Sequence, residues 1–82
     1  MDRHRVNDTR RAELAIQRAS GFKVTIFTNH RYVTQNAASL VEARLRGTNL
    51  EIWASNSRRA LVYAMQPDGS AELIPNWYGE KR

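Results

Sequence analysis

Arginine side chains and aromatic rings are the groups in this 82-residue chain best suited to binding a ligand. Thirteen residues are basic and eight acidic, eleven of the thirteen are arginine, and the formal net charge is +5. The planar guanidinium group forms paired hydrogen bonds with phosphate and with carboxylate. This charge favours a nucleic-acid partner or an acidic protein surface, and a coding bias toward arginine is the competing explanation.

Residue groupings typical of enzymes and metal sites are missing from the sequence. The chain has no cysteine, and His4 and His30 lack a spacing that suggests shared metal ligation. Its four glycines stand singly, no serine has the context of a nucleophile elbow, and the carboxylates are scattered. We therefore expect a non-enzymatic protein that needs no metal or other cofactor.

The length of the chain fits one small domain. We expect residues 1–6 to form a flexible tail, residues 7–75 to form a single α+β domain, and residues 76–82 to form a C-terminal tail. Charged residues open the chain, no apolar run follows them, and no window reaches the length of a membrane span. The expected location is therefore cytoplasmic.

The first half of the chain predicts a helix and a hairpin. A capping residue at Asn7 or Asp8 and a stripe of mostly alanine residues predict a helix to about Ser20. Strict alternation predicts a strand over residues 22–28. Asn29 and His30 fit a two-residue turn, after which residues 31–34 return as a short strand.

Residues 36–46 fit two different structures. Leucine and alanine spacing marks a helical face that would end at Gly47, whereas residues 42–46 also alternate as a strand would, with residues 47–49 as a hairpin loop. Composition favours the helix, because alanine, leucine, glutamate and arginine form helices well and strands poorly.

The second half predicts a three-stranded antiparallel meander with strands at residues 50–54, 60–66 and 70–74. Turn signals separate the strands, at residues 55–58 and at Gln66-Pro67-Asp68-Gly69. The expected fold is thus α+β, in which an N-terminal helix, a strand or hairpin, a second helix and the meander form one sheet with the helices packed on it.

Alternation along the predicted strands also predicts what the second face of the sheet carries. If Val24 and Ile52 point toward the helices, then Phe27 and Trp53 lie on the opposite face beside Lys23. Aromatic rings among positive charges on an open sheet face are typical of proteins that stack unpaired bases. Two alternatives are that other parts of the chain cover these rings, and that this Trp53 face forms a homodimer.

Basic residues in the middle of the chain complete the candidate binding surface. Arg58 and Arg59 lie next to a turn, and a helix antiparallel to the following strand would bring Arg44 near them. The candidate nucleic-acid or partner-binding residues are Lys23, Phe27, Arg31, Arg44, Trp53, Arg58 and Arg59.

Part of the sequence resembles small phage proteins with a hairpin, a helix and a meander, among them some anti-CRISPR proteins. The segments that carry the resemblance are residues 37–44, 48–53 and 60–64 and the turn at 67–69, within residues 22–74. The resemblance is a pattern of residue types, and it implies a non-enzymatic protein that blocks a nucleic-acid path or a protein site.

The chain is also similar to ribosome-dependent mRNA interferase toxins of the RelE kind, which are small, basic and end in a meander followed by charged residues. This likeness implies cleavage roles for Arg58, Tyr63, Tyr78 and Lys81. The sequence departs from that pattern because no strand precedes the first helix and a strand interrupts the helical part. Three hypotheses follow: a basic binding protein, which leads, an interferase-like toxin, and a dimeric structural subunit.

Overall fold

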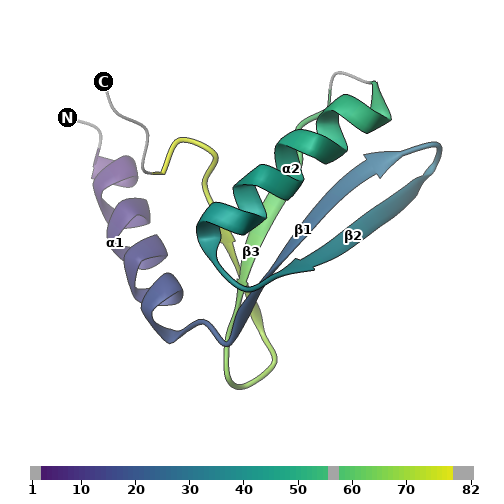
Figure 1. Cartoon of the computed structure of the whole chain (residues 1–82). Coiled ribbons are helices and arrows are strands. Elements are labelled where there is room, and N and C mark those ends of the chain that lie inside the picture. Colours follow the sequence, from purple (N-terminus) through teal and green to yellow (C-terminus); the bar gives the residue numbers. More distant parts are fainter. Residues whose placement is uncertain (1–2, 56–57, 79–82) are drawn as a thin grey trace.

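A computed structural model describes residues 3–55 and 58–78, with the side chains of residues 3–6 left out. The chain forms two helices and one antiparallel sheet, in the order α1 (Arg3–Arg18), β1 (Gly21–Thr28), β2 (Arg31–Ala37), α2 (Leu40–Ala54), β3 (Leu61–Met65) and β4 (Ala71–Ile74). The strand order in the sheet is β2-β1-β3-β4 (Figure 1). The α+β class and the helices packed on a single sheet are confirmed.

Helix α1 begins at Arg3, so the start expected at Asn7 or Asp8 is wrong and residues 3–6 form its first turn. The alanine stripe is correctly predicted, since Ala12 and Ala15 are buried. Small side chains let α1 lie close to β3 and β4. Residues 1–2, the rest of the expected N-terminal tail, fall outside the described residues.

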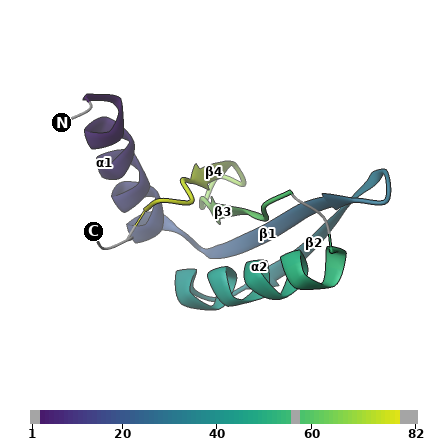
Figure 2. The same cartoon turned by 90° about the horizontal axis from the view of Figure 1, so that it is seen from above.

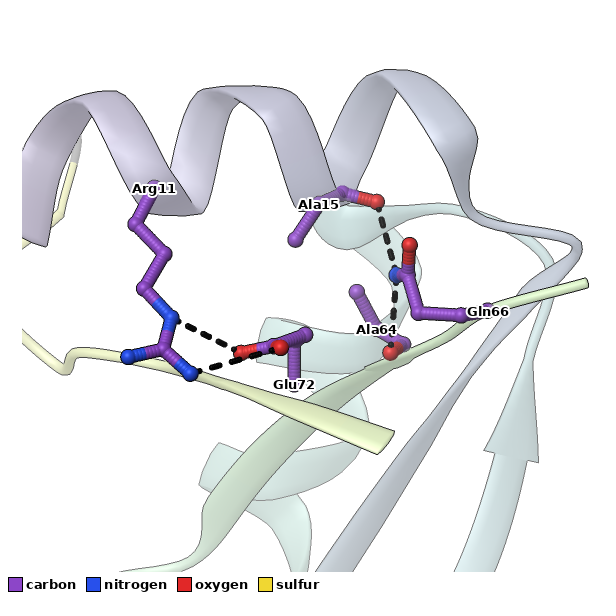
Figure 3. A network of polar contacts seen from close by, with 5 residues as sticks. All are labelled: Arg11, Ala15, Ala64, Gln66 and Glu72. Carbon is purple, nitrogen blue, oxygen red and sulfur yellow. Dashed lines mark hydrogen bonds and ion pairs between the residues drawn. The ribbon is translucent and has the colours of Figure 1, made fainter. Parts of the chain in front are cut away.

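Polar contacts fix α1 over the β3–β4 side of the sheet, as Figure 3 shows. The Gln66 side-chain amide donates to the carbonyl oxygens of Ala15 at 3.0 Å and Ala64 at 3.2 Å. Arg11 forms an ion pair with Glu72, with Nε to Oε2 at 3.1 Å. Ala15 and Arg11 belong to α1, whereas Gln66 follows β3 and Glu72 lies in β4. The Gln66–Ala15 hydrogen bond and the Arg11–Glu72 ion pair therefore hold the helix against the sheet.

The β1–β2 hairpin is confirmed. Asn29 and His30 have φ values of 51° and 62°. Two successive residues in the left-handed region are typical of a tight hairpin turn. Strand β2 extends to Ala37, opposite Phe22, and is therefore longer than the predicted segment 31–34.

Helix α2 is where the sequence prediction fails most. The helix over residues 40–46 is confirmed, and the competing strand there is wrong. However, α2 continues through Gly47 to Ala54, so the predicted strand at residues 50–54 and the hairpin loop at 47–49 are also wrong. Ser55 ends the helix with φ of 53°, and its N–H donates to the Glu51 carbonyl oxygen.

The interior position of Gly47 has a packing reason. A Cβ atom placed on Gly47 would lie 3.4 Å from the Ala60 Cβ and 3.5 Å from the Val24 Cγ1. These are ordinary van der Waals distances, so the close approach of α2 to the sheet leaves room for a side chain no larger than a methyl group, and Gly47 does not end the helix. The buried side of α2 repeats every three or four residues, at Leu40, Ala43, Gly47, Leu50 and Ala54.

Strand β1 replaces the missing strand as the neighbour of β3. The strands predicted at residues 60–66 and 70–74 are confirmed, and their turn closes with the Gln66 N–H donating to the Ser70 carbonyl oxygen at 2.8 Å. The expected three-stranded meander is thus a four-stranded sheet in which β1 pairs with both β2 and β3. Part of the expected turn at 55–58, residues 56–57, lies outside the described residues.

Both helices cover the same face of the sheet. Val24 faces α2, and the register places Val24 beside Val62, and Val62 beside Ile74. Glu72, two residues before Ile74, lies on that same face and contacts α1. Figure 2 shows α2 along one side of the β1–β2 ribbon, and α1 at the other end of the sheet, near β3 and β4.

Candidate nucleic-acid interface

One face of the sheet is not covered by either helix, and we call it the open face. The strand register assigns its side chains to the odd positions of β1 and β3 and to their neighbours. They are Lys23, Thr25, Phe27, Tyr32, Thr34, Asn36, Leu61, Tyr63, Met65, Ala71 and Leu73. None of these residues is acidic. The open face presents aromatic rings, hydroxyl groups and the charge of Lys23, together with the apolar side chains contributed by β3 and β4.

An aromatic cluster lies at the hairpin end of the open face. The ring centres of Phe27 and Tyr32 are 5.0 Å apart with the planes inclined at 59°. The guanidinium carbon of Arg58 lies 5.0 Å from the centre of the Phe27 ring. These distances suit edge-to-face packing of the rings and a cation–π contact. Tyr32 remains 71% exposed, so its ring is accessible to a ligand.

Hydroxyl groups follow the aromatic cluster along the strands. Thr25 and Thr34 are opposite each other, with their hydroxyl oxygens 3.0 Å apart. In the next row of the open face, Lys23 is exposed and lies between Asn36 on β2 and Tyr63 on β3. The open face therefore has two aromatic positions separated by about 13 Å along β1, given the rise of a β-strand.

The structure brings together three of the seven candidate residues. Lys23 and Phe27 share the open face, and Arg58 packs onto Phe27. Arg31 lies opposite Thr28, on the helix-covered face at the hairpin end. Arg59 lines a groove beside α2. Hence the candidate set does not form one continuous surface.

Arg44 has a structural role. Its guanidinium group donates to three carbonyl oxygens of the segment after β4, those of Pro75 at 3.3 Å, Asn76 at 3.3 Å and Tyr78 at 2.8 Å. Three such bonds anchor residues 75–78 against α2. The expected C-terminal tail is thus docked as far as Tyr78, and residues 79–82 fall outside the described residues.

Trp53 lies on α2, so the expectation that it shares a sheet face with Phe27 is wrong. Its side chain is 58% exposed and lines a shallow hollow with residues of β2 and α2, among them Val33 and Leu50. The expectation depends on a strand at residues 50–54, and these residues belong to α2. The proposed Trp53 face of the sheet is therefore absent.

The groove beside α2 has a volume of about 410 Å³ and lies between α2, the start of β3 and residues 76–78. Arg44, Arg59 and Glu51 contribute its charges. The Glu51 carboxylate accepts a hydrogen bond from the Ala60 N–H at 2.7 Å, and Arg44 is held by carbonyl groups. Its polar groups thus already serve to join α2 to the neighbouring segments.

Two exposed carboxyl groups have altered acidity. The Ala38 N–H, donating to Glu42, and then the Arg46 guanidinium group hold the pKa of Glu42 below its ordinary value. The Ser70 hydroxyl and N–H groups lower the pKa of Asp68 in the β3–β4 turn. Glu42 stabilises the start of α2, and Asp68 stabilises the β3–β4 turn. The hydrogen bonds that lower their pKa values thus have a structural role.

The two tyrosines suggested by the interferase likeness lie on different sides of the sheet. Tyr63 belongs to the open face, whereas Tyr78 packs against the core on the helix side. Lys81 lies outside the described residues. Among the described side chains, those of residues 7–55 and 58–78, no three histidine or acidic groups are close enough to hold a metal ion.

Sequence reasoning missed several open-face residues, chiefly Tyr32, Leu61 and Leu73. The signal was available in part, because Tyr32 follows the tight turn and must lie opposite Phe27 once the hairpin is recognised. Leu61 and Leu73 required the pairing of β1 with β3, which joins segments separated by the whole of α2.

In the part of the chain that the structure describes, neither helix has the length and hydrophobicity needed to cross a membrane. Comparisons with protein-family models, with curated proteins and with solved structures gave no match.

Proposed function

We propose that this protein binds single-stranded nucleic acid across the open face, without cleaving it. The observation that carries the proposal is the composition of that face, where aromatic rings occur with Lys23 and Arg58 and no carboxylate. Of these rings Tyr32 is exposed, and Phe27 and Tyr63 are partly buried. The two basic side chains attract a polyanion, and the open face has no carboxylate of its own that would repel it. An acidic protein partner is the competing occupant, and the absence of oligonucleotide binding in the experiment below would favour it.

Unpaired bases fit the open face better than a duplex does. In a duplex the flat faces of the bases are already stacked on one another, whereas a single strand can place a base on an aromatic side chain. Tyr32 is exposed at the edge strand and Tyr63 lies on a central strand, so two bases of one strand can stack at separate positions. Lys23, beside Tyr63, would pair with a phosphate.

The proposed action is to cover the strand. A bound protein that shields bases and phosphates blocks access of other factors to that segment, which needs no catalytic group. Hydroxyl groups of Thr25 and Thr34 between the two aromatic positions would contact the backbone or base edges.

Fluorescence anisotropy with short labelled oligonucleotides tests the proposal. The whole chain is titrated against a single strand and the matching duplex over a series of salt concentrations. We expect tighter binding of the single strand and an affinity that falls as salt rises. Replacing Tyr32 with alanine should weaken binding roughly fivefold or more, because one stacked base contributes about 1–3 kcal/mol.

Matched variants separate the open face from general charge and hydrophobicity. Trp53→Ala removes a comparably exposed aromatic ring from α2, and should leave affinity unchanged. Lys23→Ala should reduce the salt slope by about one, whereas Arg10→Ala, which removes an exposed charge from α1, should not. No binding at low salt, or equal loss from Tyr32→Ala and Trp53→Ala, contradicts the proposal.

A further inference from the structure

Three residues of the open face, Tyr32, Thr25 and Tyr63, lie on one diagonal line across the sheet. Tyr32 on β2 lies opposite Phe27 on β1, and Thr25 is two residues from Phe27 along β1. Tyr63 on β3 lies opposite Lys23, which is two residues further along β1. This line, which we call the tyrosine diagonal, separates the Cα atoms of the two tyrosines by about 16 Å, from the spacing and rise of β-strands.

The tyrosine diagonal separates two kinds of side chain. Between the two tyrosines, the side toward β2 offers hydrogen bonds or charge, from Thr34, Lys23 and Asn36, all of them exposed. The side toward β3 and β4 is apolar, and it consists of Phe27, Leu61 and Leu73. A single strand is divided in the same way, because its phosphates follow one edge and its bases extend to the other.

We propose that the bound strand follows the tyrosine diagonal, and that the open face selects single-stranded DNA containing thymine through contact of the thymine methyl group with Leu61 and Leu73. This inference rests on the proposed function, since it names the substrate class of the same site. Its structural basis is the apolar side of the tyrosine diagonal, which general attraction of a polyanion does not need.

The polar side sets the orientation of the strand. Lys23 attracts a phosphate, and threonine hydroxyl and asparagine amide groups donate to phosphate oxygens. The opposite orientation would place phosphates against leucine side chains and away from Lys23. Arg58 lies over the Phe27 ring, so its charge is at the Tyr32 end in either orientation. The phosphates therefore lie toward β2, and the bases extend toward β3 and β4.

The surroundings of Tyr63 explain the choice of thymine. Leu73 lies opposite Tyr63 and is 49% exposed, and Leu61 precedes Tyr63 by two residues on the same face. Adenine, guanine and cytosine present only hydrogen-bonding groups on the edge that carries the methyl group in thymine. Those groups would lose water against leucine without gaining a partner, whereas the methyl group gains an apolar contact.

Oligodeoxynucleotides of thymidine and of deoxyuridine, equal in length, test the inference because they differ only in the methyl group. Fluorescence anisotropy with the whole chain measures both affinities. We expect the thymidine strand to bind roughly threefold tighter or more, the effect of burying one methyl group. This ratio is measured on the parent protein and needs no variant.

Variants assign the ratio to the apolar side. Leu73→Ser should bring the thymidine-to-deoxyuridine ratio close to one, while both strands still bind. Leu45→Ser is the matched control, because Leu45 is 62% exposed on α2, away from the open face, and it should keep the ratio of the parent. Lys23→Ala should weaken both strands by the same factor, since a phosphate contact does not depend on the base.

The outcomes separate this inference from the proposed function. Equal affinity for the two strands, with binding that still falls as salt rises, overturns the choice of thymine and leaves single-strand binding in place. Failure of both strands to bind at low salt removes both proposals. A ratio that Leu73→Ser leaves unchanged, or that Leu45→Ser abolishes equally, overturns the role of the apolar side.

Discussion

The guanidinium carbon of Arg58 lies 5.0 Å from the centre of the Phe27 ring, at the end of the open face. The contact joins the segment that precedes β3 to the hairpin formed by β1 and β2. Because Phe27 also packs against Tyr32, one cation and two rings form a continuous edge of the proposed binding surface. Loss of Arg58 should therefore affect both stability and ligand binding.

Arg58→Ala should lower the free energy of unfolding by about 0.5–1 kcal/mol, the magnitude of an exposed cation–π contact. It should also weaken single-strand binding, because a positive charge leaves the open face. Arg59→Ala is the control, since Arg59 has the same charge and lies in the groove on the helix side. Denaturant unfolding and anisotropy measure the two effects. Equal effects of the two substitutions on binding would argue against a defined surface.

Gly47 provides a test of the continuous helix. Gly47→Ala should raise the free energy of unfolding by about 0.5–1 kcal/mol, because alanine favours a helix interior and its Cβ would make ordinary contacts, the nearest at 3.4 Å to Ala60. Gly47→Leu should instead destabilise by roughly 1–3 kcal/mol through overpacking against Val24. If the helix instead ended at Gly47, a leucine side chain there would not be forced against Val24, and Gly47→Leu would not destabilise the protein in this way. Chemical denaturation of the three proteins distinguishes these outcomes.

The same position shows how far the sequence could predict the fold. Gly47 followed by Thr48 and Asn49 has the composition of a turn, and local pattern cannot reveal that Ala60 and Val24 approach it. The hairpin at Asn29 and His30 was predictable because its turn is local. The pairing of β1 with β3 was not, because it depends on segments far apart in the chain.

The candidate site was predicted in the same uneven way. Phe27 and Lys23 were assigned correctly to the face opposite Val24, since alternation within one strand fixes their sides. The expected position of Trp53 is wrong because alternation predicts a strand for a segment that forms the end of α2. Arg44 was expected on the binding surface, but its hydrogen bonds to three carbonyl groups become visible only once residues 75–78 fold back onto α2.

The start of α2 should make stability depend on pH. The pKa of Glu42 is lowered in the folded protein, first by the Ala38 N–H and then by Arg46, so the unfolded chain binds a proton more readily. The stabilisation is therefore complete above the ordinary pKa of about 4.3 and is lost as the pH falls through the lower folded value. In Glu42→Gln, the free energy of unfolding should therefore fall less as the pH is lowered. Denaturant unfolding at a series of pH values measures this effect.

Ser39 supplies the control for the Glu42 variant. Its hydroxyl group accepts a hydrogen bond from the Glu42 N–H at 3.1 Å, and Ser39→Ala should cost about 1 kcal/mol. That cost should persist at neutral pH, because serine does not titrate. An unchanged acid-side slope in Glu42→Gln would show that other carboxyl groups, such as Asp68 with its lowered pKa, dominate the acid response.

The contacts of α1 should differ in strength. Gln66→Ala should cost about 1 kcal/mol, since its partly buried amide joins the Ala15 and Ala64 carbonyl groups. The ion pair of Arg11 with Glu72 is mostly exposed, and a double-mutant cycle should give a coupling well below about 1 kcal/mol. Thermal and denaturant unfolding measure both. A coupling for the ion pair larger than the cost of Gln66→Ala would reverse this order.

Chemical-shift mapping tests the central claim most directly. The labelled protein is titrated with a short single strand, and backbone amide shifts are followed for the strands and for α2. We predict the largest changes around Lys23, Phe27, Tyr32 and Tyr63, with α2 unaffected. Changes concentrated along α2 or in its groove, with the open face silent, would contradict the account.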